Sequence, residues 1–321
     1  MYRLEEAFTH SQAIIKSNLQ KTGLGIDRLT SYLASVTGKG LRARLLLICA
    51  QDAQGDIHPD ACKAAAAIEI LHLASLVHDD VMDGATTRRG LQTLNDRFDS
   101  RTAVIVGDYL LATGMGLIAE IGEDRVHEQR GEEQLMFVTK IAKTLASLAR
   151  GEYEQQLNLR NPDIDVMTYF RIISGKTASL FYVSCFIGAY LAGEPAANVR
   201  RLGRFGHAFG MAFQIFDDVK DYDWDETTAG KTIEADLKNG VMTLPVIFAM
   251  RKDKSLRRMV REAMITGKDT QKLLSYIREA GTVDETQRVS TKYLQICKRH
   301  LSYTHESKQQ DLLLLLEKLG T

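Results

Sequence analysis

The sequence predicts an all-α fold built of roughly ten or more helices, because proline is rare and apolar residues recur at helical spacing. Only four prolines occur in 321 residues, and proline breaks helix interiors because it lacks a backbone N–H. Apolar residues recur at steps of three and four, as at Ala65, Ile68 and Leu71. The same spacing returns at Leu273 and Ile277, whereas strand-like alternation is hard to find.

Glycine, proline and aspartate clusters divide the chain into these helices in order. We expect one domain over residues 1–321, because no Pro- or Ser-rich linker and no fixed-period repeat separates its parts. The predicted breaks lie at Gly38–Gly40, Gly55–Pro59, Gly84–Gly90, Gly122–Asp124, Asn161–Asp165, Gly193–Pro195, Asp223–Gly230, Gly267–Asp269 and Gly281–Asp284.

The charge balance and the cysteines exclude several functional classes. Lys plus Arg and Asp plus Glu both number 41, so there is no basic excess of the kind a general nucleic-acid binder shows. The four cysteines, Cys49, Cys62, Cys185 and Cys297, are too far apart for a C-x-x-C pair, which favours reduced thiols and a cytoplasmic location. No signal peptide or membrane-spanning run is expected, and Leu312–Leu316 is predicted to pack into the core of the protein.

Two D-D-x-x-D motifs follow apolar helical stretches, and they are the most informative feature of the sequence. Asp79 and Asp83 are four residues apart, as are Asp217 and Asp221, so each pair lies on one helical face. Two carboxylates on one face repel unless a cation lies between them, and Mg²⁺ takes such oxygen ligands together with phosphate oxygens. A single such motif is more often a solvated helix end, but two of them favour a metal–phosphate site.

Polar residues extend the first motif along its helix. His72 precedes Asp79 by about two turns, and Glu69 lies one turn earlier. A lone histidine here would more often be a satisfied core residue, but its alignment with the aspartates favours contact with a ligand.

Basic residues that could meet phosphate lie near glycines. Arg88 and Arg89 directly follow the first acidic motif, and Gly38-Lys39-Gly40-Leu41-Arg42 precedes an apolar helix. Further candidates are Lys176-Thr177 and Gly230-Lys231-Thr232. The last two resemble the end of a P-loop but lack its earlier glycine, so nucleotide binding is rejected. An HD-type phosphohydrolase would explain neither the second motif nor the paired arginines, and it stays a minor alternative.

With these residues in place, the chain resembles the trans-type prenyl (polyprenyl) diphosphate synthase family of isoprenoid synthases. The ordered set of elements from Gly38 to Pro245 is specific, although each element alone is weak. The elements are G-K-G-L-R (38–42), H-L-A-S-L-V-H-D-D-V-M-D (72–83), R-R-G (88–90), G-D-Y-L-L-A (107–112), G-E-Y-E-Q (151–155), K-T-A-S-L (176–180), F-Q-I-F-D-D-V-K-D (213–221), G-K-T (230–232) and T-L-P (243–245).

The resemblance implies a role for each site residue, around a central active-site cavity. A cluster of about three Mg²⁺ ions would bridge the allylic diphosphate, with Asp79, Asp83, Asp217, Lys176 and Lys231 as the catalytic set. The metal ligands would be Asp79, Asp80, Asp83, Asp217, Asp218 and Asp221. The allylic diphosphate would be contacted or supported by Arg88, Lys176, Thr177, Gln214 and Lys231. The diphosphate of isopentenyl diphosphate would be held by Lys39, Arg42, His72 and Arg89.

Two departures from the family pattern concern basic residues. The family usually shows G-G-K-R-x-R-P where this chain has Thr37-Gly38-Lys39-Gly40-Leu41-Arg42-Ala43, so one arginine and the proline are absent. The family often has a basic residue before T-L-P, where Val241-Met242 stand here. The first change is expected to weaken the binding of isopentenyl diphosphate while keeping its main contacts.

The implied reaction is Mg²⁺-dependent condensation of isopentenyl diphosphate with an allylic diphosphate to give a linear all-trans prenyl diphosphate. Short-chain members carry a bulky aromatic residue four or five positions before the first aspartate, where this chain has Ser75 and Ala74. We therefore expect a product of roughly twenty carbons or more, made in an apolar cavity that excludes water.

Two further alternatives remain open. A class I terpene cyclase would share the fold and one aspartate motif, but it lacks the isopentenyl diphosphate clamp. The chain could also be the catalytic subunit of a heteromeric synthase that is inactive without its partner, and nothing decides between homodimer and heterodimer. A non-catalytic subunit would lack the aspartates. No nucleic-acid partner is expected, and membrane contact would be at most peripheral, through the lipid product.

Overall fold

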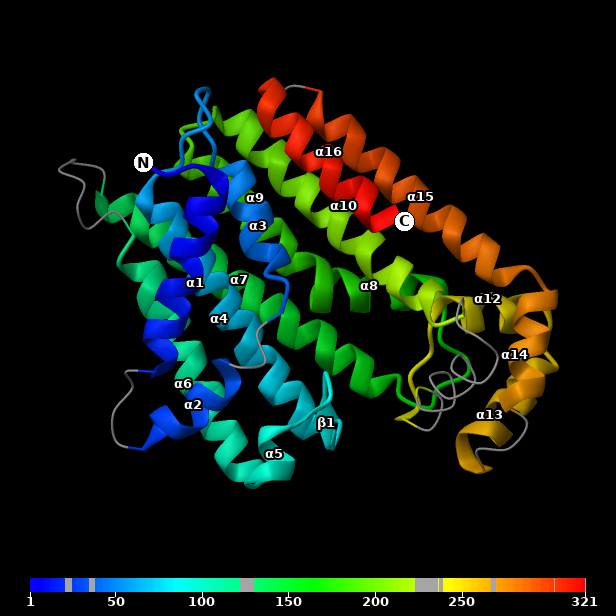
Figure 1. The fold of residues 1–321 in the computed structure, drawn as a ribbon. Helices are drawn as coiled ribbons and strands as arrows, with labels where there is room; N and C mark the ends of the chain where they lie inside the picture. Colours follow the sequence, from blue (N-terminus) through cyan, green and yellow to red (C-terminus); the bar gives the residue numbers. More distant parts are fainter. Residues whose placement is uncertain are drawn as a thin grey trace. The chain divides into compact units, whose positions relative to one another are not determined.

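The all-α prediction is confirmed by the computed structural model (Figure 1). The structure describes residues 1–20, 25–34, 38–121, 130–222, 236, 239–266, 270–302 and 304–320. Within these ranges the only strands are β1 (Thr87–Arg88) and β2 (Leu91–Gln92), a small hairpin that begins in the predicted break at Gly84–Gly90 and extends two residues past it. The breaks at Gly122–Asp124, Asp223–Gly230 and Gly267–Asp269 lie outside the described residues.

The chain divides into two compact units, and each collects segments from several parts of the sequence. Helices α7 (Arg130–Leu157), α10 (Ala196–Lys220) and α16 (Glu306–Gly320) each contribute residues to both units. The prediction of a single domain over residues 1–321 stays a prediction. The first unit comprises Met1–Lys143, Leu180–Gly206 and Tyr303–Leu312, and the second comprises Thr144–Ser179, His207–Ser302 and Leu313–Thr321.

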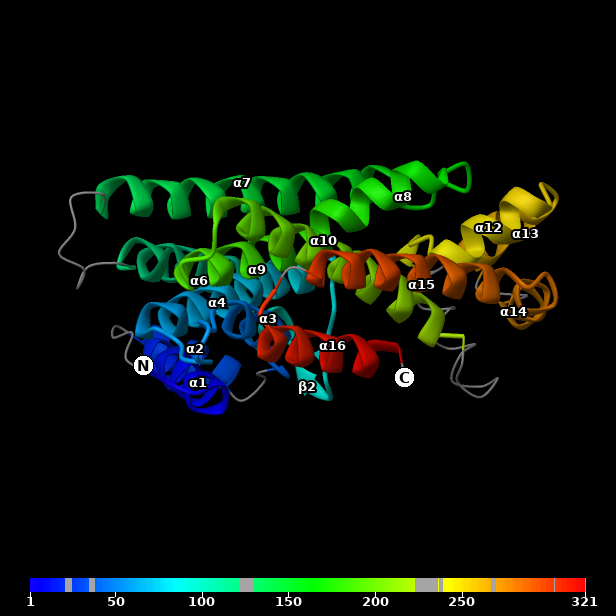
Figure 2. The same ribbon diagram turned by 90° about the horizontal axis from the view of Figure 1, so that it is seen from above.

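Helix α4 is the central helix of the first unit, where it contacts α1, α3 and α6 (Figures 1 and 2). It begins at Pro59 and ends at Met82. The first turn of a helix tolerates proline because the backbone N–H that proline lacks would have no partner within the helix there. Alanines 64–67 are completely buried, and their small side chains let neighbouring helices approach closely. The helices of this unit are α1 (Leu4–Gln20), α2 (Ile26–Ala34), α3 (Leu41–Cys49), α4 (Pro59–Met82), α5 (Leu94–Arg97), α6 (Ser100–Ala119) and α9 (Ser179–Leu191), with parts of α7, α10 and α16.

Helix α12 contacts α8, α13, α14 and α15 in the second unit. Leu273 and Ile277, which carried the predicted helical spacing, are completely buried in its core. A π-helical turn, η1 (Ser174–Ala178), interrupts an otherwise α-helical run, which the sequence did not predict. The helices of this unit are α8 (Val166–Ile173), α12 (Leu244–Lys252), α13 (Leu256–Thr266), α14 (Thr270–Glu279) and α15 (Thr282–Leu301), with parts of α7, α10 and α16.

Burial accounts for several of the apolar segments. All four cysteines are described and buried, and none forms a disulfide, as predicted. Leu312 and Leu316 are buried while Leu314 is exposed, so the leucine run packs mainly inward. Three helical segments are long and apolar enough to cross a membrane: Pro59–Met82, Ser100–Ala119 and Val166–Leu191. Most of the first and third is buried within the protein, but only 39% of the second is. The expectation of no spanning segment stays a prediction.

Candidate active-site residues in the two units

The first aspartate motif forms the carboxyl end of α4. The backbone N–H of Asp83 donates to the carbonyl oxygen of Asp79 over 2.8 Å, so these residues lie one turn apart, as the spacing predicts. Asp79 is half-buried and Asp83 is exposed. Asp80 differs from both, because it is only 7% exposed. Its Oδ1 accepts a hydrogen bond from Nε of Arg88 at 2.8 Å and forms an ion pair with Nη2 of the same arginine at 2.8 Å.

The β1–β2 hairpin positions the two arginines that follow the motif. Arg88 pairs with Leu91 across the hairpin, and the two-residue turn between them has φ values of 51° at Arg89 and 78° at Gly90. Positive φ at both central residues is the requirement of a type I′ turn. The guanidinium of Arg89 lies so close to Gly38 that a Cβ there would be 2.7 Å from Nη1. Gly38 therefore leaves the space that Arg89 occupies.

Arg42, Arg88 and Arg89 surround His72, and we call these four residues the cationic cluster. Burial lowers the pKa of His72 well below its usual value, and the charges of the three arginines lower it further. The imidazole is therefore neutral at neutral pH. Lys39, predicted to act with them, is exposed in the loop before α3.

Arg42 is held by α3 and α9 with one donor unsatisfied. Its guanidinium lies 4.4 Å above the ring centre of Phe181. Burial lowers the pKa of Arg42 to about 10, against the opposing charge of Glu69, so the side chain stays charged at neutral pH. Its Nε is buried and has no hydrogen-bond partner among the described residues. Because an unsatisfied buried donor is unfavourable, this nitrogen suits an anionic ligand.

In the second unit, the second aspartate motif lies at the end of α10. Asp218 is 5% exposed and accepts three hydrogen bonds: from the hydroxyl of Tyr169 at 2.7 Å, from Nε2 of Gln214 at 3.2 Å and from the backbone N–H of Leu244 at 3.2 Å. Burial raises the pKa of Asp218 to about 6, although these donors act in the opposite direction. Burial, followed by the charge of Asp217, likewise raises the pKa of Asp221 to about 6.

A further carboxylate, which the sequence reasoning missed, belongs to this acidic group. Burial and the charges of Asp221, Asp218 and Asp217 raise the pKa of Asp236 to about 7. Concentrated carboxylates with raised pKa values attract cations, since a cation relieves their repulsion. The only sequence signal for Asp236 was its place between the G-K-T and T-L-P elements.

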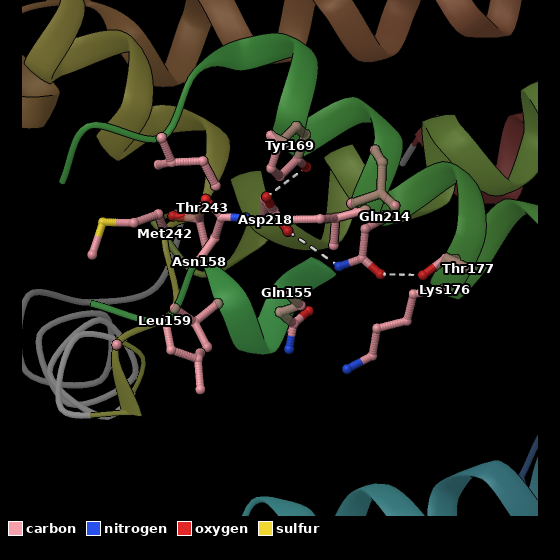
Figure 3. Close-up of a pocket in the computed structure, with 15 residues that line it drawn as sticks. Gln155, Asn158, Leu159, Tyr169, Lys176, Thr177, Gln214, Asp218, Met242 and Thr243 are labelled. Carbon is pink, nitrogen blue, oxygen red and sulfur yellow. Dashed lines mark hydrogen bonds between the residues drawn. The ribbon is translucent and has the colours of Figure 1, made fainter. Parts of the chain in front are cut away.

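A pocket of about 170 Å³ brings four predicted residues together in the second unit: Lys176, Thr177, Gln214 and Asp218 (Figure 3). The hydroxyl of Thr177 donates to Oε1 of Gln214 over 2.9 Å, and Gln214 in turn donates to Asp218. The π-helical turn carries Lys176 and Thr177, and such turns are frequent at functional sites.

Three pocket-side residues were not assigned roles from the sequence. Tyr169 and Gln155 line the pocket, and Glu152 pairs with Lys176 through Oε2 and Nζ at 2.5 Å. Glu152 and Gln155 belong to the G-E-Y-E-Q element, so that element was the available signal. No sequence pattern pointed to Tyr169, because its hydrogen-bond partner, Asp218, is 49 residues away in the sequence.

The aspartates fit a hard divalent cation better than a transition metal. Their donors are carboxylate oxygens, and each motif supplies two of them one helical turn apart, as Mg²⁺ sites with phosphate ligands use. No group of three His, Cys, Asp or Glu side chains that could hold an ion by themselves occurs among the residues the structure describes. Lys231, predicted to be catalytic, lies outside the described residues.

Comparisons with known proteins agree with the resemblance seen in the sequence. A family model described as polyprenyl synthetase matches residues 25–280. The chain is 36% identical to heptaprenyl diphosphate synthase component 2 of Geobacillus stearothermophilus, covering 82% of this chain and 79% of that one. It is 32% identical to a geranyl-diphosphate-specific all-trans-nonaprenyl-diphosphate synthase of Rhodobacter capsulatus, covering 91% and 87% of the two chains.

A solved structure extends the match to the fold. The polyprenyl synthase of Caulobacter crescentus CB15, complexed with calcium and isoprenyl diphosphate, aligns with a TM-score of 0.86 at 27% identity. The alignment covers 99% of this chain and 95% of that one. The matched range includes both aspartate motifs, the arginines of the hairpin and the residues of the pocket. The chain therefore belongs to the polyprenyl synthetase family, and it is a prenyltransferase.

Proposed function

We propose that the chain is a Mg²⁺-dependent synthase that condenses isopentenyl diphosphate with an allylic diphosphate to give a linear all-trans prenyl diphosphate. The observation that carries this proposal is the cationic cluster, with the buried, unsatisfied Nε of Arg42. The cationic cluster would bind one diphosphate directly, in addition to the diphosphate that metal ions on the aspartate motifs would bind. A reaction between two diphosphates needs both sites, whereas a cyclase acts on a single diphosphate and needs only the metal site. Incubation with both substrates and mass spectrometry of the products tests it: a cyclic hydrocarbon would favour the cyclase.

The proposed roles follow from where the charges lie. In the second unit, Lys176, Thr177 and Gln214 would contact the allylic diphosphate beside the second aspartate motif. In the first unit, Arg42, His72 and Arg89 would hold the isopentenyl diphosphate. Each aspartate motif would supply carboxylates to the metal ions. The allylic C–O bond breaks, the isopentenyl double bond attacks the cation, and a proton leaves to the released diphosphate. Bound Mg²⁺ would stabilise the charge on the leaving diphosphate. The protein orients both substrates and needs no nucleophile.

The proposed metal is Mg²⁺, although the Caulobacter relative was solved with calcium. Calcium accepts larger and more variable oxygen shells, whereas Mg²⁺ keeps several waters and binds through few carboxylates plus phosphates. We expect activity to be lost with a chelator, restored by Mg²⁺, and restored poorly by Ca²⁺. Equal recovery with both ions would remove the preference for Mg²⁺.

A product of about twenty carbons or more is proposed from the small residues before Asp79. Ala74 is completely buried in α4, and Leu71 packs against Gly114, where a Cβ would be 2.7 Å from Cδ2 of Leu71. The relatives that make heptaprenyl and nonaprenyl products support a long chain. Ala74→Phe should shorten the longest product, while a thermal melt controls for overpacking, which costs about 1–3 kcal/mol. An unchanged product profile from a folded variant would refute the argument.

We further propose that a second copy of the chain covers the exposed face of α6. Val104 and Ile105 are 40% and 54% exposed on this apolar helix. In a two-fold dimer the same apolar face of a second copy would pack against them and bury both faces. One relative is named as a component 2, so a different subunit is the competing outcome. Sedimentation of the purified chain should show a dimer, with Ile105→Lys weakening it. A monomer that becomes active only with another protein would favour the heteromeric enzyme.

The location stays a proposal as well. We propose a cytoplasmic enzyme with at most peripheral membrane contact through its lipid product. Cell fractionation with and without product synthesis would test it, and a protein that resists extraction by high salt from the membrane fraction would contradict it.

A further inference from the structure

Helix α7 crosses the π-helical turn at two glycines, and their backbones touch. A Cβ on Gly151 would lie 2.6 Å from the backbone nitrogen of Lys176, and a Cβ on Gly175 would lie 2.7 Å from the carbonyl oxygen of Ser147. Real Cβ atoms do not approach other atoms this closely, so both positions require glycine. The crossing therefore fixes where α7 meets the turn that carries Lys176.

This crossing brings Glu152 against Lys176. Oε2 of Glu152 lies 2.5 Å from Nζ of Lys176, a contact that is close enough for an ion pair although it does not have the geometry of a hydrogen bond. Oε1 of Glu152 accepts a hydrogen bond from Nε2 of Gln156 at 3.2 Å. Glu152 is 6% exposed. A buried carboxylate without a paired cation is strongly unfavourable, so the pair favours conformers of Lys176 that keep its ammonium beside Glu152.

Glu152 does not line the pocket, although its partner Lys176 does. Lys176 lines the pocket with Gln155, Thr177 and Gln214, whereas Glu152 is not among the lining residues (Figure 3). A lysine side chain has a flexible four-carbon stem and loses considerable rotamer entropy when it is fixed. A partner that fixes it in advance removes that loss from the binding step.

We propose that Glu152 is a positioning residue, which holds the ammonium of Lys176 where it binds the diphosphate of the allylic substrate. This inference rests on the proposed function, because it assigns Lys176 to that diphosphate. A positioning role differs from a purely structural ion pair in one respect. Loss of the Glu152 carboxylate should impair the use of the allylic substrate through Lys176 and leave the use of the isopentenyl substrate unchanged.

The test compares Glu152→Gln with Glu154→Gln on the same helix. Glu154 pairs with Arg171 at 2.8 Å, and their side chains are 25% and 58% exposed. Glu154 does not line the pocket, so Glu154→Gln removes the same charge from the same helix outside the pocket. We expect Glu152→Gln to lower kcat/KM for the allylic diphosphate by roughly ten- to hundredfold, with the KM for isopentenyl diphosphate unchanged. Glu154→Gln should behave as the unaltered enzyme.

A double-mutant cycle with Lys176→Met separates positioning from structure. If Glu152 acts through Lys176, adding Glu152→Gln to Lys176→Met should cause no further loss. Lys176→Met alone leaves a buried charge unpaired and can unfold the chain, whereas the double variant removes both charges. Should the single variant not fold, the affinity of inorganic diphosphate for the Mg²⁺-loaded enzyme, measured by calorimetry, replaces the cycle. Glu152→Gln should weaken that affinity about tenfold or more, and Glu154→Gln should not.

The outcomes separate this inference from the proposed function. Equal losses for both substrates, additive losses in the Lys176→Met background, or unchanged diphosphate affinity in Glu152→Gln would overturn the role of Glu152. An unaltered enzyme that binds inorganic diphosphate but makes no linear product would instead overturn the proposed function, while the diphosphate measurement would still decide the role of Glu152.

Discussion

Replacing Tyr169 by phenylalanine removes a single hydroxyl from the buried surroundings of Asp218. That hydroxyl donates to Oδ2 of Asp218 over 2.7 Å, and the only other donor to the same oxygen within the described residues is the backbone N–H of Leu244, at 3.2 Å. Burial and the neighbouring Asp218 raise the pKa of Tyr169 well above its usual value. The tyrosine hydroxyl therefore stays protonated at neutral pH and remains a hydrogen-bond donor.

The size of the effect follows from the charge and burial of this hydrogen bond. A hydrogen bond to a charged group contributes about 1.5–3 kcal/mol, which corresponds to a factor of roughly 10 to 100. Phenylalanine fills nearly the same space, so cavity formation adds little. We expect Tyr169→Phe to lower kcat/KM for the allylic diphosphate about tenfold or more, and to raise the Mg²⁺ concentration needed for half-maximal activity, because Asp218 loses its fixed orientation.

The matched control is Tyr276→Phe. The hydroxyl of Tyr276 also donates to an aspartate, Oδ2 of Asp253, at 3.0 Å, but neither residue lines the pocket. Steady-state kinetics at several Mg²⁺ concentrations and thermal melts should be measured for both variants. The reasoning fails if Tyr169→Phe keeps the unaltered activity and Mg²⁺ requirement, or if Tyr276→Phe loses as much activity.

Two further predictions concern stability. Lys308 is completely buried and pairs with Glu194 at 2.6 Å, so Lys308→Met should lower the free energy of unfolding by about 3–5 kcal/mol. Arg258 pairs with Glu262 on the surface, so Arg258→Met should lower it by less than about 1 kcal/mol. Burial acts to raise the pKa of Glu194, but hydrogen bonds led by that of Lys308 lower it overall; the stabilisation is therefore present above the usual glutamate pKa and lost as the pH falls through the lowered value. Thermal melts of both variants and the unaltered protein should be measured from neutral to acid pH. The difference in melting temperature between Lys308→Met and the unaltered protein should become smaller only at acid pH. Gly151→Ala places a methyl 2.6 Å from the backbone of Lys176 and should lower stability by about 1–3 kcal/mol and weaken diphosphate binding; unchanged melting and binding would contradict the glycine crossing.

Features that depend on neighbouring residues in the sequence were predictable. The helix class follows from periodicity and rare proline, and the pairing of Asp79 with Asp83 follows from helical geometry alone. Pro59 at a helix start and Gly281 before α15 also matched their predicted breaks. Each of these requires only the local path of the backbone.

Features that depend on tertiary packing were not predictable in the same way. Tyr169 and Asp218 are 49 residues apart in the sequence, and no periodicity relates them. The π-helical turn, the pairing of Glu152 with Lys176 and the unsatisfied nitrogen of Arg42 all arise where helices from separate segments meet. Glycines in the sequence did not predict the helix crossing, because a glycine that permits a close crossing cannot be distinguished by sequence from one that ends a helix.

In both aspartate motifs the middle aspartate differs from the two outer ones in its burial and its hydrogen bonds, which the sequence does not reveal. In each unit the second aspartate of D-D-x-x-D is buried and bonded to the protein: Asp80 to Arg88, and Asp218 to Tyr169. The outer aspartates are half-buried or exposed. These hydrogen bonds take up part of the acceptor capacity of the middle carboxylate and fix its orientation, whereas the outer pair lies one turn apart on a more exposed face. We therefore expect alanine at an outer position to abolish Mg²⁺-dependent turnover. Asparagine at either middle position, which keeps an acceptor oxygen, should retain measurable activity; equal loss at inner and outer positions would show that all six carboxylates bind the metal alike.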